Sequence, residues 1–214
     1  MTISLRNCRP FDAFAMIIDL NGFTKMVAKD EVGTVAQDTR DALAGGIGAV
    51  EENGGLVVGF MGDAFLAVLD DDESVVRAAL STAKDLDRTC EWISDAQSEN
   101  PDDWSHMPGG PSLKILIEYG RIDVSTINSK FLGEQFLLAG VPINYASRIG
   151  SFGKGNRCLL GPAAAERIGR SNKIEGPYTT KGKTGEPPYT CYRFDMGDVW
   201  KEGKRRRGKE TFGG

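Results

Sequence analysis

The chain has 214 residues, of which 40% are hydrophobic, and this composition supports one domain with a substantial core. Its 26 Lys and Arg residues against 30 Asp and Glu residues give a net charge of −4, which argues against a nucleic-acid binder, because such a protein needs a basic surface. The sequence contains no 18-residue apolar run, so we expect neither a membrane span nor a membrane partner.

The first half of the chain alternates between short apolar runs, typical of strands, and longer segments with apolar residues at helical spacing. In order, this pattern predicts a buried strand over 13–20, a long helix over 32–52, a β-hairpin over 56–70 and a second helix over 73–97. Asn53-Gly54-Gly55 is a strong stop signal for the first helix. Gly62-Asp63 separates the two runs of the hairpin, and a two-residue loop of this kind accepts positive φ angles.

The second half opens with a polar stretch, 98–112, which predicts a loop that carries His106 as a solvated residue. It then predicts a strand pair over 113–120 and 121–127, a helix over 140–150 and a short strand over 157–160. A helix opened by Pro162 and a closing strand over 189–195 follow. Mostly antiparallel strands with helices on one face predict an α+β sandwich, whose first two-thirds fit the ferredoxin-like βαββαβ unit with additional strands.

We expect an N-terminal lead at 1–11, one folded domain at 12–196 and a basic tail at 197–214. Residues 201–214 hold six Lys and Arg and almost nothing apolar, which predicts a disordered segment or, as the alternative, a contact with a polyanion. The four cysteines, Cys8, Cys90, Cys158 and Cys191, are far apart and form no CxxC pair, so we expect no zinc site. No apolar signal peptide opens the chain, and a cytoplasmic location with reduced thiols is expected.

Two carboxylates stand where neighbouring strands end. Asp19 ends the first strand and Asp63 lies at the tip of the hairpin, so a βαββ arrangement places them side by side. Crowded carboxylates repel one another unless a cation neutralises them, and Mg²⁺ binds carboxylates together with substrate phosphates. The turn 20–24 that follows could hold a polyphosphate with its backbone N–H groups. The alternative is that Asp19 is a helix N-cap and Asp63 a turn residue.

The sequence resembles the catalytic domain of the class III nucleotidyl cyclases, the family of adenylate and guanylate cyclases. The stretches that carry the resemblance occur in the family's order and span most of the chain: FAMIIDLNGFTKM (14–26), NGGLVVGFMGDAFLAV (53–68), LKILIEYGRIDV (113–124), GVPINYASRI (140–149) and TTKGK (179–183). The resemblance implies the class III cyclase fold, a nucleoside triphosphate substrate and two divalent metal ions per site, Mn²⁺ or Mg²⁺. It also implies a head-to-tail homodimer with both sites at the interface.

The resemblance implies a role for each matching residue. Asp19, Asp63 and the Leu20 carbonyl match the metal ligands, and the phosphate-binding turn matches Asn21, Gly22, Phe23 and Thr24. Asn144 matches the asparagine that orients the ribose, and Arg148, one helical turn later, matches the arginine that stabilises the α-phosphate in the transition state. The lysine that binds the triphosphate matches Lys181 or Lys183, and the pattern leaves both open.

The chain departs from the family at the residues that select the base. Purine cyclases carry Lys or Glu where this chain has Gly59, beside Phe60, and Asp, Thr or Cys where it has Leu137. Neither Gly59 nor Leu137 offers a side-chain hydrogen bond to a purine edge. The chain therefore resembles most the uridylate and cytidylate cyclases of the bacterial antiphage Pycsar systems, with UTP slightly favoured over CTP. The alternatives are an adenylate or guanylate cyclase and a catalytically silent nucleotide-binding or interaction module.

Overall fold

The computed structural model describes residues 5, 8–21, 32–99, 112–152, 157–169, 174–180 and 185–197. The helices of this part are α2 (Val32–Glu52), α3 (Asp72–Glu99), α4 (Val141–Ile149) and α5 (Pro162–Ile168). Its strands are β1 (Phe11–Asn21), β2 (Leu56–Phe60), β3 (Ala64–Leu69), β4 (Ser112–Ser129), β5 (Gly133–Ala139), β6 (Arg157–Leu160), β7 (Ile174–Thr179) and β8 (Thr190–Phe194). Residues 100–111 with His106, and the tail from 198 onward, lie outside the described residues.

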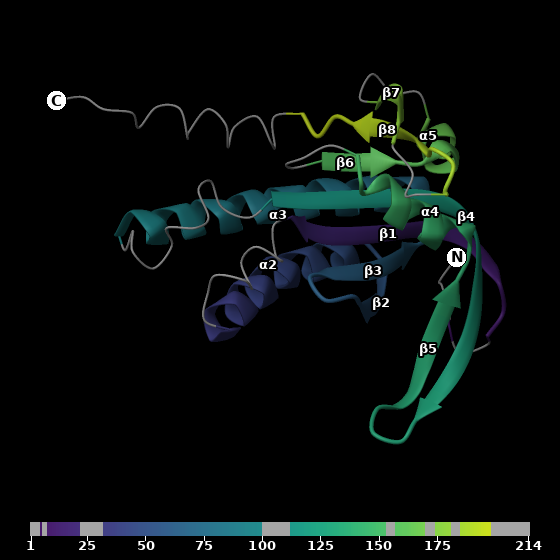
Figure 1. Cartoon of the computed structure of the whole chain (residues 1–214), viewed down its shortest axis with the longest axis horizontal. Coiled ribbons are helices and arrows are strands. Elements are labelled where there is room, and N and C mark those ends of the chain that lie inside the picture. The colour runs from purple at the N-terminus through teal and green to yellow at the C-terminus, as the bar shows by residue number, and fades with distance from the viewer. Residues whose placement is uncertain are drawn as a thin grey trace.

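All eight strands belong to one sheet with the order β2-β3-β1-β4-β6-β8-β7, and β5 pairs with β4 outside this path (Figure 1). The four strands at one end follow the ferredoxin-like order, with β1 antiparallel to both β3 and β4. This confirms the α+β fold and the βαββαβ unit that the sequence predicts. β6, β8 and β7 extend the unit, and β6 pairs with β4 in parallel.

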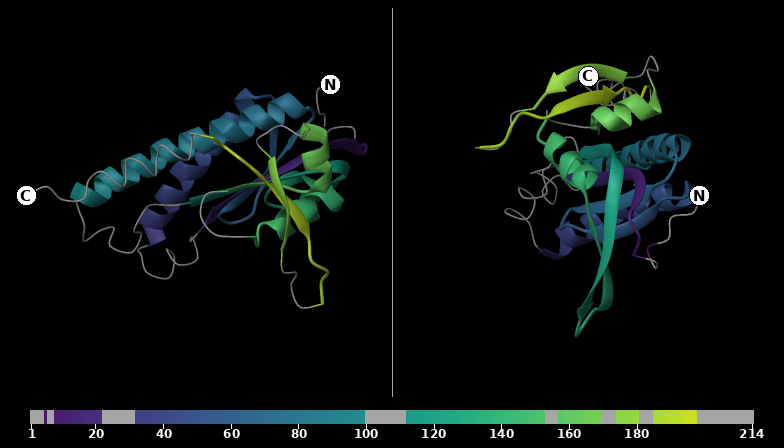
Figure 2. Two further views of the ribbon diagram at one scale, coloured as in Figure 1. Left: turned by 90° about the horizontal axis from the view of Figure 1, so that it is seen from above. Right: turned by 90° about the vertical axis from the view of Figure 1, so that its right-hand side faces the viewer.

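Strict alternation along β1 creates a core on each side of the sheet, because successive side chains of a strand point to opposite faces. Phe14, Met16 and Ile18 belong to the larger core, which α2 and α3 cover, and these two helices lie side by side (Figure 2). Ala13, Ala15 and Ile17 belong to the second core, which α4 covers. The prediction that helices cover one face is therefore wrong in one element, since α4 packs on the opposite face.

The hairpin between β2 and β3 has the predicted two-residue loop. Met61 and Ala64 exchange backbone hydrogen bonds of 2.8 and 3.3 Å, and Gly62 between them has a φ of 68°. A glycine suits this position because a side chain would disfavour that backbone angle. The loop places Asp63 directly before the first residue of β3.

The predicted strand pair over 113–120 and 121–127 is wrong, because both segments form the single strand β4. Gly120 reads as a turn residue in sequence, yet with a φ of 151° it lets the strand bend and continue. The first part of β4 pairs with β1 as far as Ile122, and the rest pairs with β5 from Asp123 to Ser129. The β4–β5 arm, residues 123–139, projects from the body of the protein (Figures 1 and 2).

The sequence did not predict β5 and β7. Every residue of β5 is exposed or half-buried, so the strand lacks the alternation that a core imposes. β7 contains Gly176-Pro177, which reads as a turn, and proline is tolerated there because β7 is an edge strand.

Candidate active site

Asp19 and Asp63 lie together where β1 ends. Asp19 pairs in register with Ala64, and the backbone N–H of Leu20 donates to the Asp63 carbonyl at 3.1 Å. Burial raises the pKa of the Asp19 carboxyl above its ordinary value, and the negative charge of Asp63 raises it further. The structure thus brings the two carboxylates together as the sequence predicts, in a partly buried place where their charges oppose each other.

Lys114 is the third member of this cluster, and the sequence analysis missed it. It stands opposite Asp19 in the β1–β4 register, and its positive charge acts against the rise in the Asp19 pKa. Its ammonium donates to the carbonyl of Gly150, just beyond α4, at 2.5 Å. Burial lowers the pKa of Lys114, while Asp19 opposes that shift. The sequence does contain a signal for it, because a lysine between the apolar residues Leu113 and Ile115 of a strand indicates that a partner for its charge lies nearby.

The cluster suits hard divalent cations. Asp19 and Asp63 supply carboxylate oxygens, which Mg²⁺ and Mn²⁺ prefer, and two crowded carboxylates gain from a cation between them. The described residues contain no group of three or more His, Cys, Asp or Glu side chains that could enclose a metal ion. The Leu20 carbonyl stays the predicted third ligand.

Asn144 and Arg148 lie four residues apart on α4, with their neighbours Ala146 and Ile149 packed against the sheet. The Asn144 side chain is exposed. An Nη2 atom of Arg148 lies 2.9 Å from a carboxylate oxygen of Glu186, in the segment before β8. The sequence analysis did not single out Glu186, and no local pattern indicates it.

A second contact ties α4 to the same segment. The hydroxyl of Tyr145 donates to the carbonyl of Thr190 at 3.0 Å and accepts from its N–H at 3.1 Å. The Tyr145 ring packs edge-on against Tyr189, with centroids 5.1 Å apart. Thr180 and Tyr189 close the base of the β7–β8 connection through a backbone hydrogen bond of 2.8 Å. Both ends of the loop 181–188 therefore lie beside α4.

Several predicted phosphate-binding residues lie outside the described residues, namely Gly22, Phe23, Thr24, Lys181 and Lys183. Asn21 is the last residue of β1 and pairs with Ser112, and only its backbone is described. The choice between the two lysines stays a prediction. The structure describes only residues on either side of them, Thr180 and Tyr189, which are joined by a backbone hydrogen bond.

The three residues predicted to face the base occupy different strands. Gly59 and Phe60 lie on the edge strand β2, and Leu137 lies on β5 of the arm. A Cβ atom at Gly59 would meet nothing within 4 Å, so the glycine leaves open space there. The Phe60 and Leu137 side chains are 65% and 49% exposed, and both present apolar surface to solvent in the single chain.

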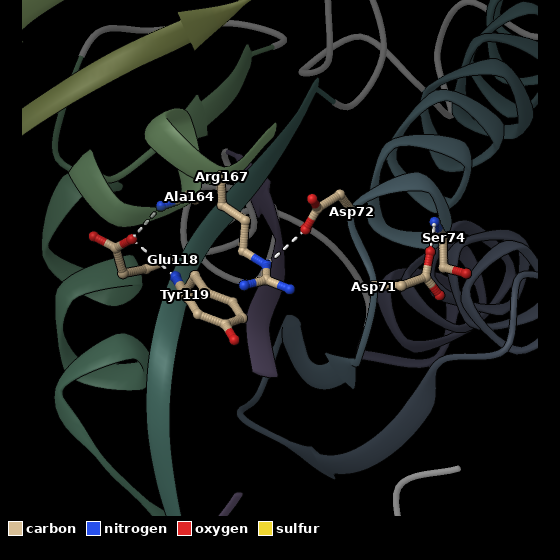
Figure 3. A network of polar contacts seen from close by, with 7 residues as sticks. All are labelled: Asp71, Asp72, Ser74, Glu118, Tyr119, Ala164 and Arg167. Atoms are coloured by element: carbon tan, nitrogen blue, oxygen red, sulfur yellow. Dashed lines mark hydrogen bonds and ion pairs between the residues drawn. The ribbon is translucent and has the colours of Figure 1, made fainter. Parts of the chain in front are cut away.

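Glu118 of β4 is a buried carboxylate that lies next to Ala164 of α5 (Figure 3). Its Oε1 atom accepts hydrogen bonds of 2.8 Å from the N–H groups of Tyr119 and Ala164, the latter in the first turn of α5. Burial raises the pKa of Glu118, and these bonds act in the opposite direction. Nearby, Arg167 of α5 stacks over Tyr119 at 4.2 Å and pairs with Asp72 of α3 at 2.7 Å. The first contact joins α5 to β4, and the second joins it to α3.

The side chains of three cysteines are described, and none of these three forms a disulfide: Cys8 is exposed, whereas Cys158 and Cys191 are buried. Burial raises the pKa of both buried thiols, that of Cys191 to about 11, so neither is a nucleophile at neutral pH. Within the described part of the chain, no helix has the length and apolar character to cross a membrane.

Solved structures resemble this fold over most of its length. A guanylyl cyclase, Cya2, matches with a TM-score of 0.70 at 18% identity, over 87% of this chain and 92% of its own. The adenylyl cyclase CyaB from P. aeruginosa matches with a TM-score of 0.66 at 14% identity, over 87% and 94%. The guanylate cyclase domain of RhGC from Catenaria anguillulae, in complex with GTP, matches with a TM-score of 0.64 at 16% identity, over 87% and 97%.

The chain has the fold of the nucleotidyl cyclase domains. This confirms the fold that the sequence resemblance implies, and it does so for adenylyl and guanylyl cyclases alike. No protein-family model and no curated protein sequence matches the chain. At identities of 14–18% the likeness concerns the cyclase fold, and the activity has to be argued from the residues themselves.

Proposed function

We propose that the protein is a nucleotidyl cyclase, which converts a nucleoside triphosphate into its 3′,5′-cyclic nucleotide and pyrophosphate. The observation that carries the proposal is the carboxylate pair Asp19 and Asp63 beside Lys114, on a cyclase fold and at the residues that match the metal ligands. Among the described residues, the charged neighbours of Asp19 are a second carboxylate, which opposes its charge, and one lysine.

In the proposed reaction the ribose 3′-hydroxyl loses its proton to water as its oxygen attacks the α-phosphorus, the new O–P bond forms, and the bond to the bridging oxygen of the leaving pyrophosphate breaks. Metal ions held by Asp19 and Asp63 would supply activation of the hydroxyl and neutralisation of phosphate charge. Asn144 orients the ribose, and Arg148 stabilises the charge that develops on the α-phosphate. Lys114 adds a fixed positive charge next to the carboxylates, where the phosphates would bind. Positioning and electrostatics supply most of the rate in phosphoryl transfer.

A homodimer is part of this proposal. The sequence resemblance implies that each site takes its metal-binding aspartates from one copy and Asn144 and Arg148 from the other. The β4–β5 arm supports an interface with a second copy, because the turn at its tip holds Phe131 and Leu132, 90% and 72% exposed. Side chains this apolar on a projecting arm are typical of surfaces that another protein covers. A head-to-tail pair would complete two equivalent sites.

We favour a pyrimidine nucleotide as the substrate, UTP slightly over CTP. The support is chemical: Gly59 and Leu137 stand where purine cyclases carry polar base readers, and neither offers a side-chain hydrogen bond, while Phe60 beside Gly59 adds apolar surface. The fold alone fits a purine substrate equally well, so adenylate or guanylate cyclase is the second candidate. The antiphage signalling role follows from the sequence resemblance alone and stays a prediction.

The test is to incubate the purified protein with ATP, GTP, CTP and UTP in separate reactions with Mn²⁺ and to identify products by mass spectrometry. Cyclic UMP or cyclic CMP as the main product supports the full proposal, and cyclic AMP or GMP supports a purine cyclase. The Asp63→Ala variant is the matched control and should form no cyclic product. Absence of product from all four nucleotides, with the parent protein folded and dimeric, would favour the silent module.

The base preference can be tested separately at Gly59. Gly59→Lys adds a donor into open space, and we expect it to raise the share of cyclic AMP among the products. Gly48→Lys is the matched control, since Gly48 on α2 also has nothing within 4 Å of an added Cβ. An unchanged product distribution in Gly59→Lys would show that this position does not face the base.

A further inference from the structure

Glu186 is the partner of the arginine that the proposed function places at the α-phosphate. Its carboxylate lies 2.9 Å from Nη2 of Arg148, and the two side chains retain 27% and 29% exposure respectively. Ion pairs elsewhere on the described surface have more exposed members, such as Arg77 with Glu73, at 54% and 86%. An ion pair that is shielded from water holds its geometry more firmly than an exposed one.

The pair uses only part of its hydrogen-bonding capacity. Arginine and carboxylate usually meet through two parallel bonds. Here Nε of Arg148 and Oε2 of Glu186 are both buried, and neither has a hydrogen-bond partner among the residues that the structure describes. A buried donor without a partner is costly in a folded protein, and such groups concentrate where a ligand completes them. Arg148 is thus held at Nη2 by Glu186, while a donor on the same guanidinium stays unused.

Hydrogen bonds on either side of Glu186 hold the neighbouring residues against α4 and against each other. The Tyr145 hydroxyl joins α4 to Thr190 with two hydrogen bonds, and Thr180 closes the loop base against Tyr189. Arg148 lies less than one helical turn from Tyr145 on the same helix. The distance between helix and loop is therefore fixed on one side by Tyr145 and on the other by the ion pair.

We propose that Glu186 is a positioning residue for the cyclase reaction, which holds the Arg148 guanidinium through Nη2 and keeps the part of that side chain that remains exposed, 29%, turned toward the α-phosphate. The inference rests on the proposed function. Glu186 itself touches no substrate, and it acts by preventing Arg148 from turning toward solvent. Since the arginine contributes in the transition state, its orientation affects kcat more than KM.

The test compares steady-state kinetics of the parent protein and Glu186→Ala with the nucleotide that the parent turns over. We expect kcat to fall roughly ten- to hundredfold, as for misplaced catalytic groups, with KM changed by less than about threefold. The same substitution in an Arg148→Ala background should cost less than about twofold more, because Glu186 then has nothing to position. Glu175→Gln is the matched control: Glu175 pairs with Arg193 on the same hairpin, and its loss should leave kcat unchanged.

Each outcome separates the inference from the function on which it rests. A parent protein that forms no cyclic nucleotide refutes the proposed function, whatever Glu186 does. An active parent whose Glu186→Ala variant keeps kcat, or gains activity, overturns the positioning role. An equal loss in both backgrounds also overturns it, since Glu186 would then act independently of Arg148. If Glu186→Ala does not fold, Glu186→Gln, which keeps the shape and removes the charge, takes its place in the same cycle with the same criteria.

Discussion

Replacing Gly161 by alanine should destabilise the protein through the buried carboxylate of Glu118. A Cβ atom at Gly161 would overlap Oε2 of Glu118, lie 2.5 Å from its Cδ and 3.0 Å from Cδ1 of Tyr145. The backbone of Gly161 is extended, with a φ of −76°, so alanine brings no backbone strain. The substitution therefore tests one contact, because the carboxylate has to leave the place where it accepts from Tyr119 and Ala164.

The magnitude follows from these hydrogen bonds. Two bonds to a charged acceptor contribute about 1.5–3 kcal/mol each, so losing them costs about 3 kcal/mol or more. For a domain of this size that corresponds to a melting temperature lower by about 6–12 °C. Thermal unfolding followed by circular dichroism at neutral pH measures it. Gly48→Ala is the control of opposite sign: it meets no atom within 4 Å, and the better helix former should raise the melting temperature of the protein.

A melting temperature of Gly161→Ala within about 2 °C of the parent would refute this reasoning, because 1 kcal/mol already shifts it by about 2–4 °C. Glu118 would then move without losing its bonds, and the carboxylate would not be what fixes α5 on β4. A fall of equal size in Gly48→Ala would indicate that the protein tolerates no added methyl group, and the loss at Gly161 could no longer be assigned to Glu118.

Two further predictions concern the proposed site. Asp63→Ala should abolish cyclic nucleotide formation, yet the metal-free variant should melt no lower than the parent at neutral pH, because it relieves the repulsion that raises the pKa of Asp19. In the parent, the raised folded-state pKa of Asp19 means that its contribution to stability is complete below its ordinary pKa and is lost as the pH rises. The melting temperature of the variant relative to the parent should therefore increase from about pH 4 to neutrality. A clear drop in melting temperature would instead make Asp63 a structural turn residue. Replacing both Phe131 and Leu132 by serine should shift the dimer to a monomer in sedimentation velocity and remove cyclase activity. The control Glu134→Ser, on the same arm, should do neither. A dimer that stays intact in the double variant would exclude the tip of the arm from the interface.

The parts of the fold that the sequence predicted are those that local patterns encode. β1 alternates between two cores, and its apolar run is therefore unambiguous. The hairpin follows from Gly62-Asp63, because glycine accepts the φ of 68° that the loop requires. The wrong element was the strand pair at Gly120, where a glycine marks a bend within one strand. Whether a glycine turns or bends a strand depends on the partners of that strand, which local sequence does not contain.

The residues of the candidate site likewise fall into those that local sequence predicts and those that it does not. The aspartates at the end of β1 and in the hairpin could be predicted because each follows a local boundary between strand and turn. Lys114 and Glu186 could not, since their meaning depends on pairings with Asp19 and Arg148 that join distant parts of the chain. A lysine within an apolar strand is a signal that a partner exists, but the register decides which residue that partner is.

The charges of the two clusters together constrain how a nucleotide can bind. The described groups assigned to the site are three acids, Asp19, Asp63 and Glu186, and two bases, Lys114 and Arg148. These groups carry a net negative charge, so by themselves they repel a triphosphate. Favourable binding must therefore draw on divalent cations at the carboxylate pair, on loop lysines, or on both. Because Glu186 already neutralises Arg148, the arginine adds little to the attraction of free nucleotide, and in the proposed reaction it acts where charge develops at the α-phosphate, which is where an interaction accelerates the reaction.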